Sequence, residues 1–392
     1  MRYVIDVTQK QVDYISRLVN LGRYSSTAQF ILTAMENQLY IEEGDEVTKL
    51  PTNKLANGNS TIHIKEYTNN PTDYPGIDVD VVPSLTDIRS NKVKTMSYPR
   101  FEDLACSIKR GKTLNESDAW LWGQVNRIFP IKLGLRILLA SLGKEETVEL
   151  ESFRTKAGEI ALAYGKMLRG HERHEKKIRV ERVSAGLPID ISDNEYRELT
   201  IAKLGKNTRV GEIDAYLQQE EFKSTNRYRA QFLASMRKDG KLEGAMPYLR
   251  FVSLKKHEDG KVYIGVTNAG LDFACLKNPI IDDKNFDASL ADKEKEYYLE
   301  HVYKNVKGEH AAIQWLLKKI ESGINRREQI NDRLKAELNP KWEDSDLVIN
   351  TQRAGLMARM FELGLIGRDK EGVSVEYKVT TNGMQLITKK GR

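Results

Sequence analysis

Arginine and amide side chains recur in two stretches of the carboxy-terminal half of this 392-residue chain, and both residue types can read DNA bases. The first stretch offers Asn226, Arg227, Arg229 and Arg237, followed by Lys238. The second offers Gln352, Arg353 and Arg359. An arginine can bridge O6 and N7 of guanine, and an amide can bridge adenine. We therefore predict base contacts from these side chains, with Lys238 directed towards the DNA backbone.

The two stretches belong to an internal repeat. "NRYRAQFLASMRKDGKLEG" from Asn226 aligns with "NTQRAGLMARMFELGLIGR" from Asn350, which pairs Met236 with Met360 and Gly240 with Gly364 at an offset of 124 residues. Further on, "YIGVTNAGLDFA" (263–274) aligns with "YKVTTNGMQLI" (377–387) at an offset of 113. Each copy predicts three helices, the third ending at a glycine, then a hairpin whose second strand runs into V-T-x-x-G and a last helix.

That order of elements resembles the winged helix-turn-helix family, over residues 195–285 and again over 305–392. The resemblance implies that the third helix of each copy enters the major groove and that the hairpins, or wings, contact phosphates. The wing residues would be Lys255, Lys256, Arg368 and Lys370. Residues 195–280 and 310–392 each hold fifteen Lys/Arg and eleven Asp/Glu, an excess of four positive charges that favours DNA. Residues 286–304 between the copies predict a charged connecting helix.

The amino-terminal residues predict a strand and two short helices. Tyr3, Ile5 and Val7 alternate on one face of a strand over 3–7, and Thr8 caps a helix that runs to about residue 20. Ser26-Thr27-Ala28-Gln29 has the form of a capping box and starts a second helix that runs to about residue 40. So small a unit buries too little apolar surface to fold alone. Pairing two copies through the strand would solve this, so we expect a homodimer.

Residues 1–43 therefore resemble the ribbon-helix-helix family of the Arc-repressor type. The resemblance implies that Arg2, Val4 and Asp6 read bases and that Ser25, Ser26 and Thr27 hold a phosphate at the start of the second helix. However, residues 1–50 hold five Lys/Arg and seven Asp/Glu, a poor charge balance for DNA. A ribbon that only dimerises the chain therefore stays open as the alternative.

Between these regions the pattern predicts a linker over 44–97 and a helical domain over 98–190. Residues 131–143 form a strongly apolar helix, a second helix starts near residue 150, and Trp120 and Trp122 fill core. "IRVERV" (178–183) alternates like a strand, so this domain could be a degenerate third winged helix. His171 and His174 are three residues apart, whereas the H-E-x-x-H zinc motif needs four, so we expect a solvated helix end.

Composition narrows the class of protein. Apolar residues make up 40% of the chain, which is enough for real cores, and the formal net charge is +6. No apolar run approaches the roughly 18 residues that span a bilayer, and no signal peptide opens the chain, so we expect a cytoplasmic, nucleoid-associated protein. Two distant cysteines and the lack of a Gly-rich phosphate loop or a catalytic triad spacing predict no enzyme, no cofactor and no metal. The expected fold class is mostly α with small β elements (α+β).

The sequence thus predicts a dimeric, sequence-specific protein that binds double-stranded DNA, as a transcriptional regulator. One alternative is a replication-initiator or partition protein of a plasmid or virus that binds repeated sites. Another is a non-enzymatic assembly or scaffold protein whose modules contact only protein, because winged helices serve both uses. Repeated modules and exposed strands would also permit assembly beyond the dimer.

Overall fold

The computed structural model describes residues 82, 85, 88, 93–105, 115–177, 181–191, 194–204, 210–338, 346–371 and 374–388. By its internal contacts the chain divides into Met1–Ile64 and Lys65–Arg392, and every described residue lies in the second unit. The predicted ribbon-helix-helix, and nearly all of the predicted linker, lie outside the described residues. The structure is mostly helical, at 61%, with a few small sheets, which confirms the expected α+β class.

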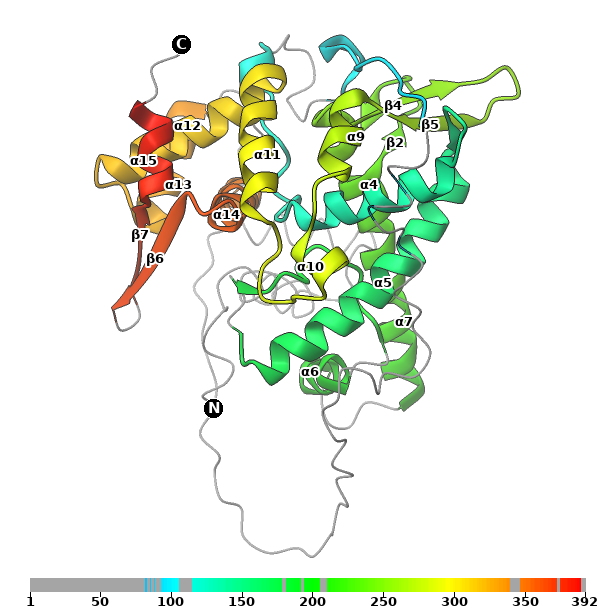
Figure 1. Ribbon diagram of the computed structural model, residues 1–392. Helices are drawn as coiled ribbons and strands as arrows, with labels where there is room; N and C mark the ends of the chain where they lie inside the picture. The colour runs from blue at the N-terminus through cyan, green and yellow to red at the C-terminus, as the bar shows by residue number, and fades with distance from the viewer. Residues whose placement is uncertain are drawn as a thin grey trace, which may run out of the picture. The chain divides into compact units, whose positions relative to one another are not determined.

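The described elements follow one another along the chain as shown in Figure 1. In order they are η3 (Phe101–Asp103), η4 (Glu116–Asp118), α4 (Phe129–Leu142), β1 (Val148–Glu149), α5 (Leu150–His174), α6 (Asn194–Leu204), α7 (Val210–Arg227), η6 (Tyr228–Leu233), β2 (Ser235–Met236), β3 (Leu242–Glu243), α8 (Ala245–Tyr248), β4 (Val252–Lys256), β5 (Val262–Val266), α9 (Asn268–Ala274), α10 (Pro279–Asp283), α11 (Asp292–Asn305), α12 (Lys307–Glu321), α13 (Arg327–Leu338), α14 (Asp346–Glu362), β6 (Ile366–Glu371), β7 (Ser374–Val379) and α15 (Thr381–Thr388). The helices expected from residues 131 and 150, the connecting helix and both predicted hairpins are therefore present.

The first structural module is spread over a long stretch of chain. Its sheet has the strand order β1-β5-β4, with Val148 opposite Ile264 and Leu254 opposite the same residue on the other side. The helices α4, α5, α8 and α9 pack with this sheet. Because β1 precedes residue 190 and pairs with β5, the predicted boundary between a domain over 98–190 and one over 195–285 is wrong. Residues 98–190 supply the first helices of this module rather than a third winged helix, and the described residues 181–183 form no strand.

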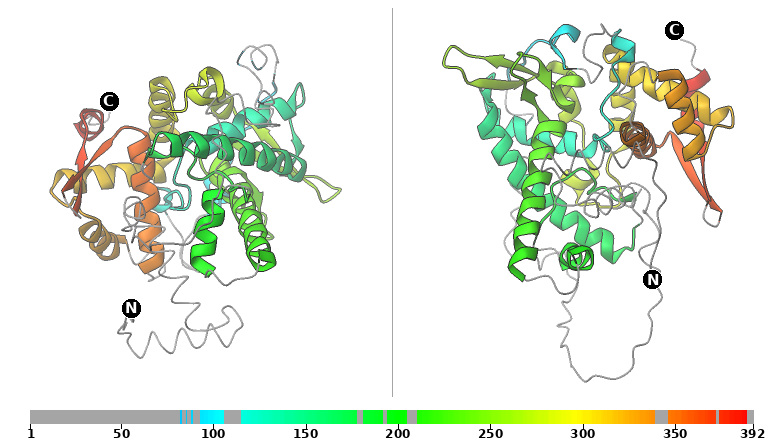
Figure 2. Two further views of the ribbon diagram at one scale, coloured as in Figure 1. Left: turned by 90° about the horizontal axis from the view of Figure 1, so that it is seen from below. Right: turned by 180° about the vertical axis from the view of Figure 1, so that it is seen from behind.

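The second structural module is continuous in sequence and follows the predicted order. Helices α12, α13 and α14 precede the β6–β7 hairpin, in which Ile366 lies opposite Val379, and α15 closes the module. On the other side of β7, Tyr377 N donates to Asn325 O at 3.0 Å, so the segment before α13 lies where β1 lies in the first module. Figures 1 and 2 show the β4–β5 and β6–β7 hairpins projecting from opposite sides of the described unit.

The V-T-x-x-G sequence has the same structural role in both modules. Thr267 Oγ1 accepts from Gly270 N at 3.2 Å and donates to Arg250 O at 2.7 Å. Thr380 Oγ1 likewise accepts from Gly383 N at 3.2 Å and donates to Gly364 O at 2.6 Å. Each threonine therefore caps the last helix and ties it to the end of an earlier one.

These contacts correct the register of the repeat. Arg250 and Gly364 are equivalent, and both have left-handed backbones, with φ of 58° and 71°. Residue Phe251 N donates back to Met246 O at 2.9 Å, as Leu365 N does to Met360 O. Met360 therefore corresponds to Met246, and the predicted pairings of Met236 with Met360 and of Gly240 with Gly364 are wrong by ten residues.

The first module also lacks the long third helix that the sequence predicts after Asn226. The helix α7 passes into a π-helical turn, η6, which ends at Leu233. The chain then forms the short β2–β3 hairpin, in which Gly240 supplies a turn with φ of 80°. Only the four residues of α8 follow before β4, so an inserted hairpin occupies the predicted helix end.

The core of the described unit is centred on α4, which is apolar on nearly every side. Its Lys132 and Arg136 are nevertheless fully buried. Lys132 Nζ lies 2.7 Å from Glu294 Oε1 and donates to Phe273 O at 2.6 Å, the carbonyl near the end of α9. Burial lowers the pKa of Lys132 to about 8 and raises that of Glu294, so each charge depends on the other.

Candidate nucleic-acid interface

Two exposed turns with the same geometry lie on the first module. In the β2–β3 turn, Arg237 N donates to Lys241 O at 2.9 Å, and Asp239 Oδ1 accepts from Lys241 N at 3.2 Å. In the β4–β5 turn, His257 N donates to Lys261 O at 2.9 Å, and Asp259 Oδ1 accepts from Lys261 N at 2.9 Å. Gly240 and Gly260 both have φ of 80°. The repeated Asp-Gly-Lys sequence thus builds twin turns.

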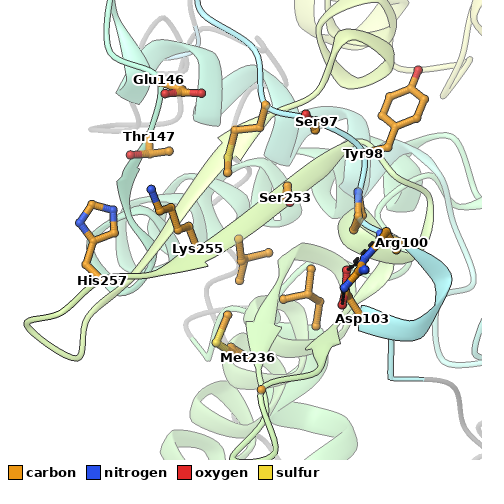
Figure 3. Close-up of a pocket in the computed structure, with 15 residues that line it drawn as sticks. Ser97, Tyr98, Arg100, Asp103, Glu146, Thr147, Met236, Ser253, Lys255 and His257 are labelled. Carbon is orange, nitrogen blue, oxygen red and sulfur yellow. Dashed lines mark hydrogen bonds and ion pairs between the residues drawn. The ribbon is translucent and has the colours of Figure 1, made fainter.

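An open groove of about 770 Å³ runs between the twin turns. Lys255 and His257 lie at one end of it, Tyr98, Arg100 and Asp103 lie at the other, and Ser253 lies between them (Figure 3). Other lining residues are Met96, Ser97, Pro99, Glu146, Thr147, Met236, Gly240, Leu242 and Leu254. The groove therefore combines strands β3 and β4 with the segment that runs into η3.

Exposed lysines that have no partner among the described residues lie on the two hairpins beside this groove, and one of them, Lys255, lines it. Lys238, Lys255 and Lys256 are exposed, and none of them has a side-chain hydrogen bond or ion pair with another residue that the structure describes. Arg237 is about half exposed and makes only a 3.5 Å contact with Asp239. Exposed cations that are not neutralised within the fold are available to phosphates.

Acidic groups also lie near the groove, and two of them, Asp103 and Glu149, lie close to a cation of the fold. Asp103 receives two hydrogen bonds of 3.1 Å from the Arg100 guanidinium, which holds the pKa of that carboxyl below its usual value. Glu149 lies 3.5 Å from Lys261 Nζ. Glu146, Glu258 and Asp259 are exposed. The net positive charge of this surface is therefore modest and belongs to the lysines.

The structure brings together only part of the predicted first set of DNA contacts. Arg237, Lys238, Lys255 and Lys256 gather around the groove. Asn226 and Arg227 end α7, and Arg229 lies in η6, where its Nη2 donates to Thr155 O on α5 at 3.4 Å. Arg227 is exposed, whereas Asn226 and Arg229 are half-buried. These three residues therefore do not share one long helix with Arg237 and Lys238, and their contact with bases stays a prediction.

The predicted base readers of the second module are buried. Arg359 Nε and Nη2 bind the two carboxylate oxygens of buried Glu309 at 2.8 and 2.9 Å. Arg353 Nε donates to Asn331 Oδ1 at 2.9 Å, and Gln352 is only 9% exposed. The prediction that Gln352, Arg353 and Arg359 contact bases is wrong in this structure, because their polar atoms face the interior.

Helix α14 packs against the segment that leads into α4. A Cβ on Gly355 would lie 1.9 Å from Gly123 O, which shows that the two backbones touch. Ile128 N and Phe129 N donate to the Glu362 carboxylate at 2.6 and 3.2 Å, so the end of α14 caps the start of α4. The middle and the end of α14 are therefore packed against the fold, whereas Asp346 and Leu347 at its start are exposed.

The second hairpin is accessible but more self-neutralised than the first. Arg368 is half-buried in β6, and Lys378 Nζ forms an ion pair with Asp369. Lys370 pairs its backbone with Val375. The remaining predicted contacts, Arg2, Val4, Asp6, Ser25, Ser26 and Thr27, lie outside the described residues.

The sequence reasoning missed Tyr98, Arg100 and Ser253 as parts of a site. It assigned residues 44–97 to a linker, but Met96 N donates to Val266 O at 2.8 Å, so residues 93–97 pack beside β5. The repeated Asp-Gly-Lys triplets at 239–241 and 259–261 are the signal that could have found the groove, because Asp-Gly marks tight hairpins.

Two further features were tested by the structure. His171 lies 3.3 Å from Asp287 and His174 lies 2.8 Å from Glu175, and no group of three metal-ligating side chains occurs among the described residues. In the described part of the chain, no helix combines the length and the apolar character needed to cross a membrane. No family model, no curated protein and no solved structure matches this chain.

Proposed function

We propose that this protein binds double-stranded DNA and that the first module contacts phosphates through its twin turns. The observation that carries the proposal is the group of exposed, internally unpartnered lysines, Lys238, Lys255 and Lys256, on two adjacent hairpins. Such hairpin cations suit the phosphate backbone or the minor groove. In this proposal the turns take the role that the sequence assigned to the third helices.

We also assign the two modules to the winged-helix fold. Three features support this assignment: the strand order β1-β5-β4, the equivalent order of Asn325, β7 and β6, and the shared Thr-x-x-Gly cap. The modules would then cover about residues 129–274 and 307–388, with α6, α7 and β2–β3 inserted in the first. Dimerisation by the amino-terminal ribbon remains part of the proposal and would double the number of DNA contacts.

Fluorescence anisotropy with the full chain and a 30-base-pair duplex, measured from 50 to 300 mM salt, tests the proposal. The logarithm of affinity should fall linearly with the logarithm of salt, with a slope that reports the number of phosphates the protein neutralises. The triple variant K238A/K255A/K256A should weaken binding on every duplex and reduce the slope by roughly 0.9 for each phosphate that is no longer neutralised. Circular dichroism should show an unchanged fold, since all three side chains are exposed.

The matched control removes the same charge elsewhere. Lys293, Lys304 and Lys318 are exposed on α11 and α12, and K293A/K304A/K318A should leave the slope unchanged. An equal loss of affinity in both triple variants would mean that only net charge matters and would contradict a defined interface. No binding by the wild-type chain at 50 mM salt would leave the modules as protein-contact surfaces.

The choice of DNA also separates the two DNA-binding roles. A regulator should prefer one fragment upstream of a gene, whereas an initiator or partition protein should prefer a fragment with repeated sites. The buried state of α14 favours recognition through hairpins and DNA shape, in which each mismatched base changes affinity little. A scaffold role predicts no preference and no salt slope.

A further inference from the structure

One edge of the first module's sheet, beside the groove, pairs with no other strand that the structure describes. The bonds from Thr267 N to Phe251 O (3.0 Å) and from His257 N to Lys261 O (2.9 Å) fix which residues of β4 face β5. Antiparallel pairing alternates, so the odd-numbered residues of β4 bond to β5. The backbone N–H and C=O groups of Val252, Leu254 and Lys256 therefore point away from the sheet, and β4 is its last strand.

The groove passes this free edge. Ser253 and Lys255 lie on one face of β4 and Leu254 lies on the other, because side chains alternate along a strand. All three line the groove, together with Leu242 of β3 across from them. A cavity can touch both faces of one strand only where it runs around that strand's edge. Of these outward-pointing backbone groups, those of Leu254, which no described residue uses, thus lie at the groove, whereas Val252 is fully buried.

The two ends of the groove carry aromatic and charged side chains. Tyr98 is 40% exposed beside Arg100 at one end, where its ring points outward from the mouth of the groove (Figure 3). Lys255 and His257 lie at the other end, where the His257 ring is 4.2 Å from the ring of Tyr263. Glu146 is the one exposed carboxylate among the lining residues, since Asp103 is bound by Arg100. The groove therefore offers exposed aromatic rings together with cations.

We propose that this groove binds a single-stranded segment of DNA. Sites for single strands combine a cationic groove for the backbone with aromatic side chains on which bases stack. The free edge of β4 adds donors and acceptors for base edges, and about 770 Å³ is the size of a cleft that encloses a drug-sized ligand, which suits a few nucleotides rather than a duplex. The inference rests on the proposed DNA binding and extends it to DNA with an unpaired end or an opened region.

Anisotropy with two fluorescent DNAs tests this assignment on the full chain. One is a blunt 20-base-pair duplex and the other is the same duplex with a six-thymidine overhang. The wild-type chain should bind the overhang DNA at least about fivefold more tightly, the effect of one base stacking on an aromatic ring. Tyr98→Ala should remove this preference without changing affinity for the blunt duplex. Ser253→Leu should do the same, because it fills the groove without a change in charge and without a ring on which a base could stack.

Controls separate this inference from the proposed function. Tyr303→Ala removes another exposed tyrosine, on α11, and should keep the preference. If the wild-type chain binds both DNAs equally, the groove assignment fails while duplex binding stands, and an extended polypeptide becomes the better ligand for the free edge. If the preference survives both Tyr98→Ala and Ser253→Leu, the single strand lies elsewhere and the assignment is again overturned. If neither DNA binds, both proposals fail.

Discussion

The two modules hold their first helix against their last helix with different chemistry. In the first, buried Lys132 on α4 donates to Phe273 O at 2.6 Å. In the second, Gln314 Nε2 on α12 donates to Leu386 O at 3.0 Å. Phe273 and Leu386 are equivalent, because each lies three residues after the glycine of V-T-x-x-G. Both modules therefore place a hydrogen-bond donor on the first helix opposite this carbonyl of the last helix, and only the first module uses a charged donor.

Removal of this donor should give the largest difference between the two modules in the free energy of unfolding. Lys132→Ala leaves Glu294 buried without its cation, which typically destabilises a protein by about 3–5 kcal/mol. Gln314→Ala removes one half-buried neutral bond and should cost only about 1 kcal/mol. Urea unfolding monitored by circular dichroism measures both.

The double variant Lys132→Met with Glu294→Leu is the control. It removes both charges and keeps apolar volume, so it should recover most of the lost stability. If the double variant is as unstable as Lys132→Ala, the loss comes from the hydrogen bonds that Lys132 and Glu294 make to their neighbours, such as those with Phe273 O, Leu276 O and Ala291 N, rather than from the unpaired carboxylate. The two modules would then depend on this donor in the same way.

The glycine of V-T-x-x-G should behave alike in both modules. A Cβ on Gly270 would lie 2.0 Å from Phe251 O, and a Cβ on Gly383 would lie 2.3 Å from Leu365 O, so alanine at either site must push the last helix off the strand. We expect losses of about 1–3 kcal/mol, the range for overpacking, with the larger loss at Gly270. Thermal unfolding tests this.

Gly367→Ala in β6 is the matched control, because a Cβ there meets nothing within 4 Å and the backbone needs no positive φ. It should be neutral or slightly stabilising. Equal losses at Gly367 and Gly383 would contradict close approach as the cause of the loss at Gly383.

The two residues with left-handed backbones, Arg250 and Gly364, should give a smaller difference in stability, with a loss in the second module and a gain in the first. Gly364→Arg places a side chain at φ of 71° and should cost about 1–2 kcal/mol. Arg250→Gly relieves the same strain but also loses the ion pair of Arg250 with Glu116, so the two effects should nearly cancel. In a Glu116→Gln background the relief should appear alone, as a gain of about 1 kcal/mol. A loss in that background would mean that Arg250 is held by packing.

The left-handed backbone at Arg250 also explains how much of the fold could be predicted from the sequence. The apolar run of α4, the hairpins and the connecting helix were predicted, because periodicity and turn residues are local signals. The register of the first copy was not predicted correctly, because a glycine is expected at a left-handed position and Gly240 fits that expectation. The chain instead uses Arg250 there, and only long-range contacts such as Thr267 Oγ1 to Arg250 O reveal it.

The candidate site was predictable only in part for a similar reason. Lys238, Lys255 and Lys256 could be found from charge on predicted turns. The burial of Arg353 and Arg359 could not, because an arginine on a helix has the same sequence signature whether it faces DNA or Glu309. Nor does sequence spacing indicate that Tyr98 lies near Lys255 across one groove.

The smallest effect concerns the helix end of the first module, where Leu249 O lies 2.7 Å from His301 Nε2 on α11. Burial lowers the pKa of His301, the bond to Leu249 O opposes this, and nearby Arg250 adds to the lowering. The folded protein therefore resists protonation more than the unfolded chain does. The free energy of unfolding should decrease as pH falls below about 6.5, the ordinary value for histidine. His301→Gln keeps an amide donor for Leu249 O and should flatten this dependence between pH 7 and pH 5. An unchanged pH profile in the variant would assign the acid sensitivity to another group that titrates in this range, such as His310, whose pKa is lowered by burial and by nearby Lys318.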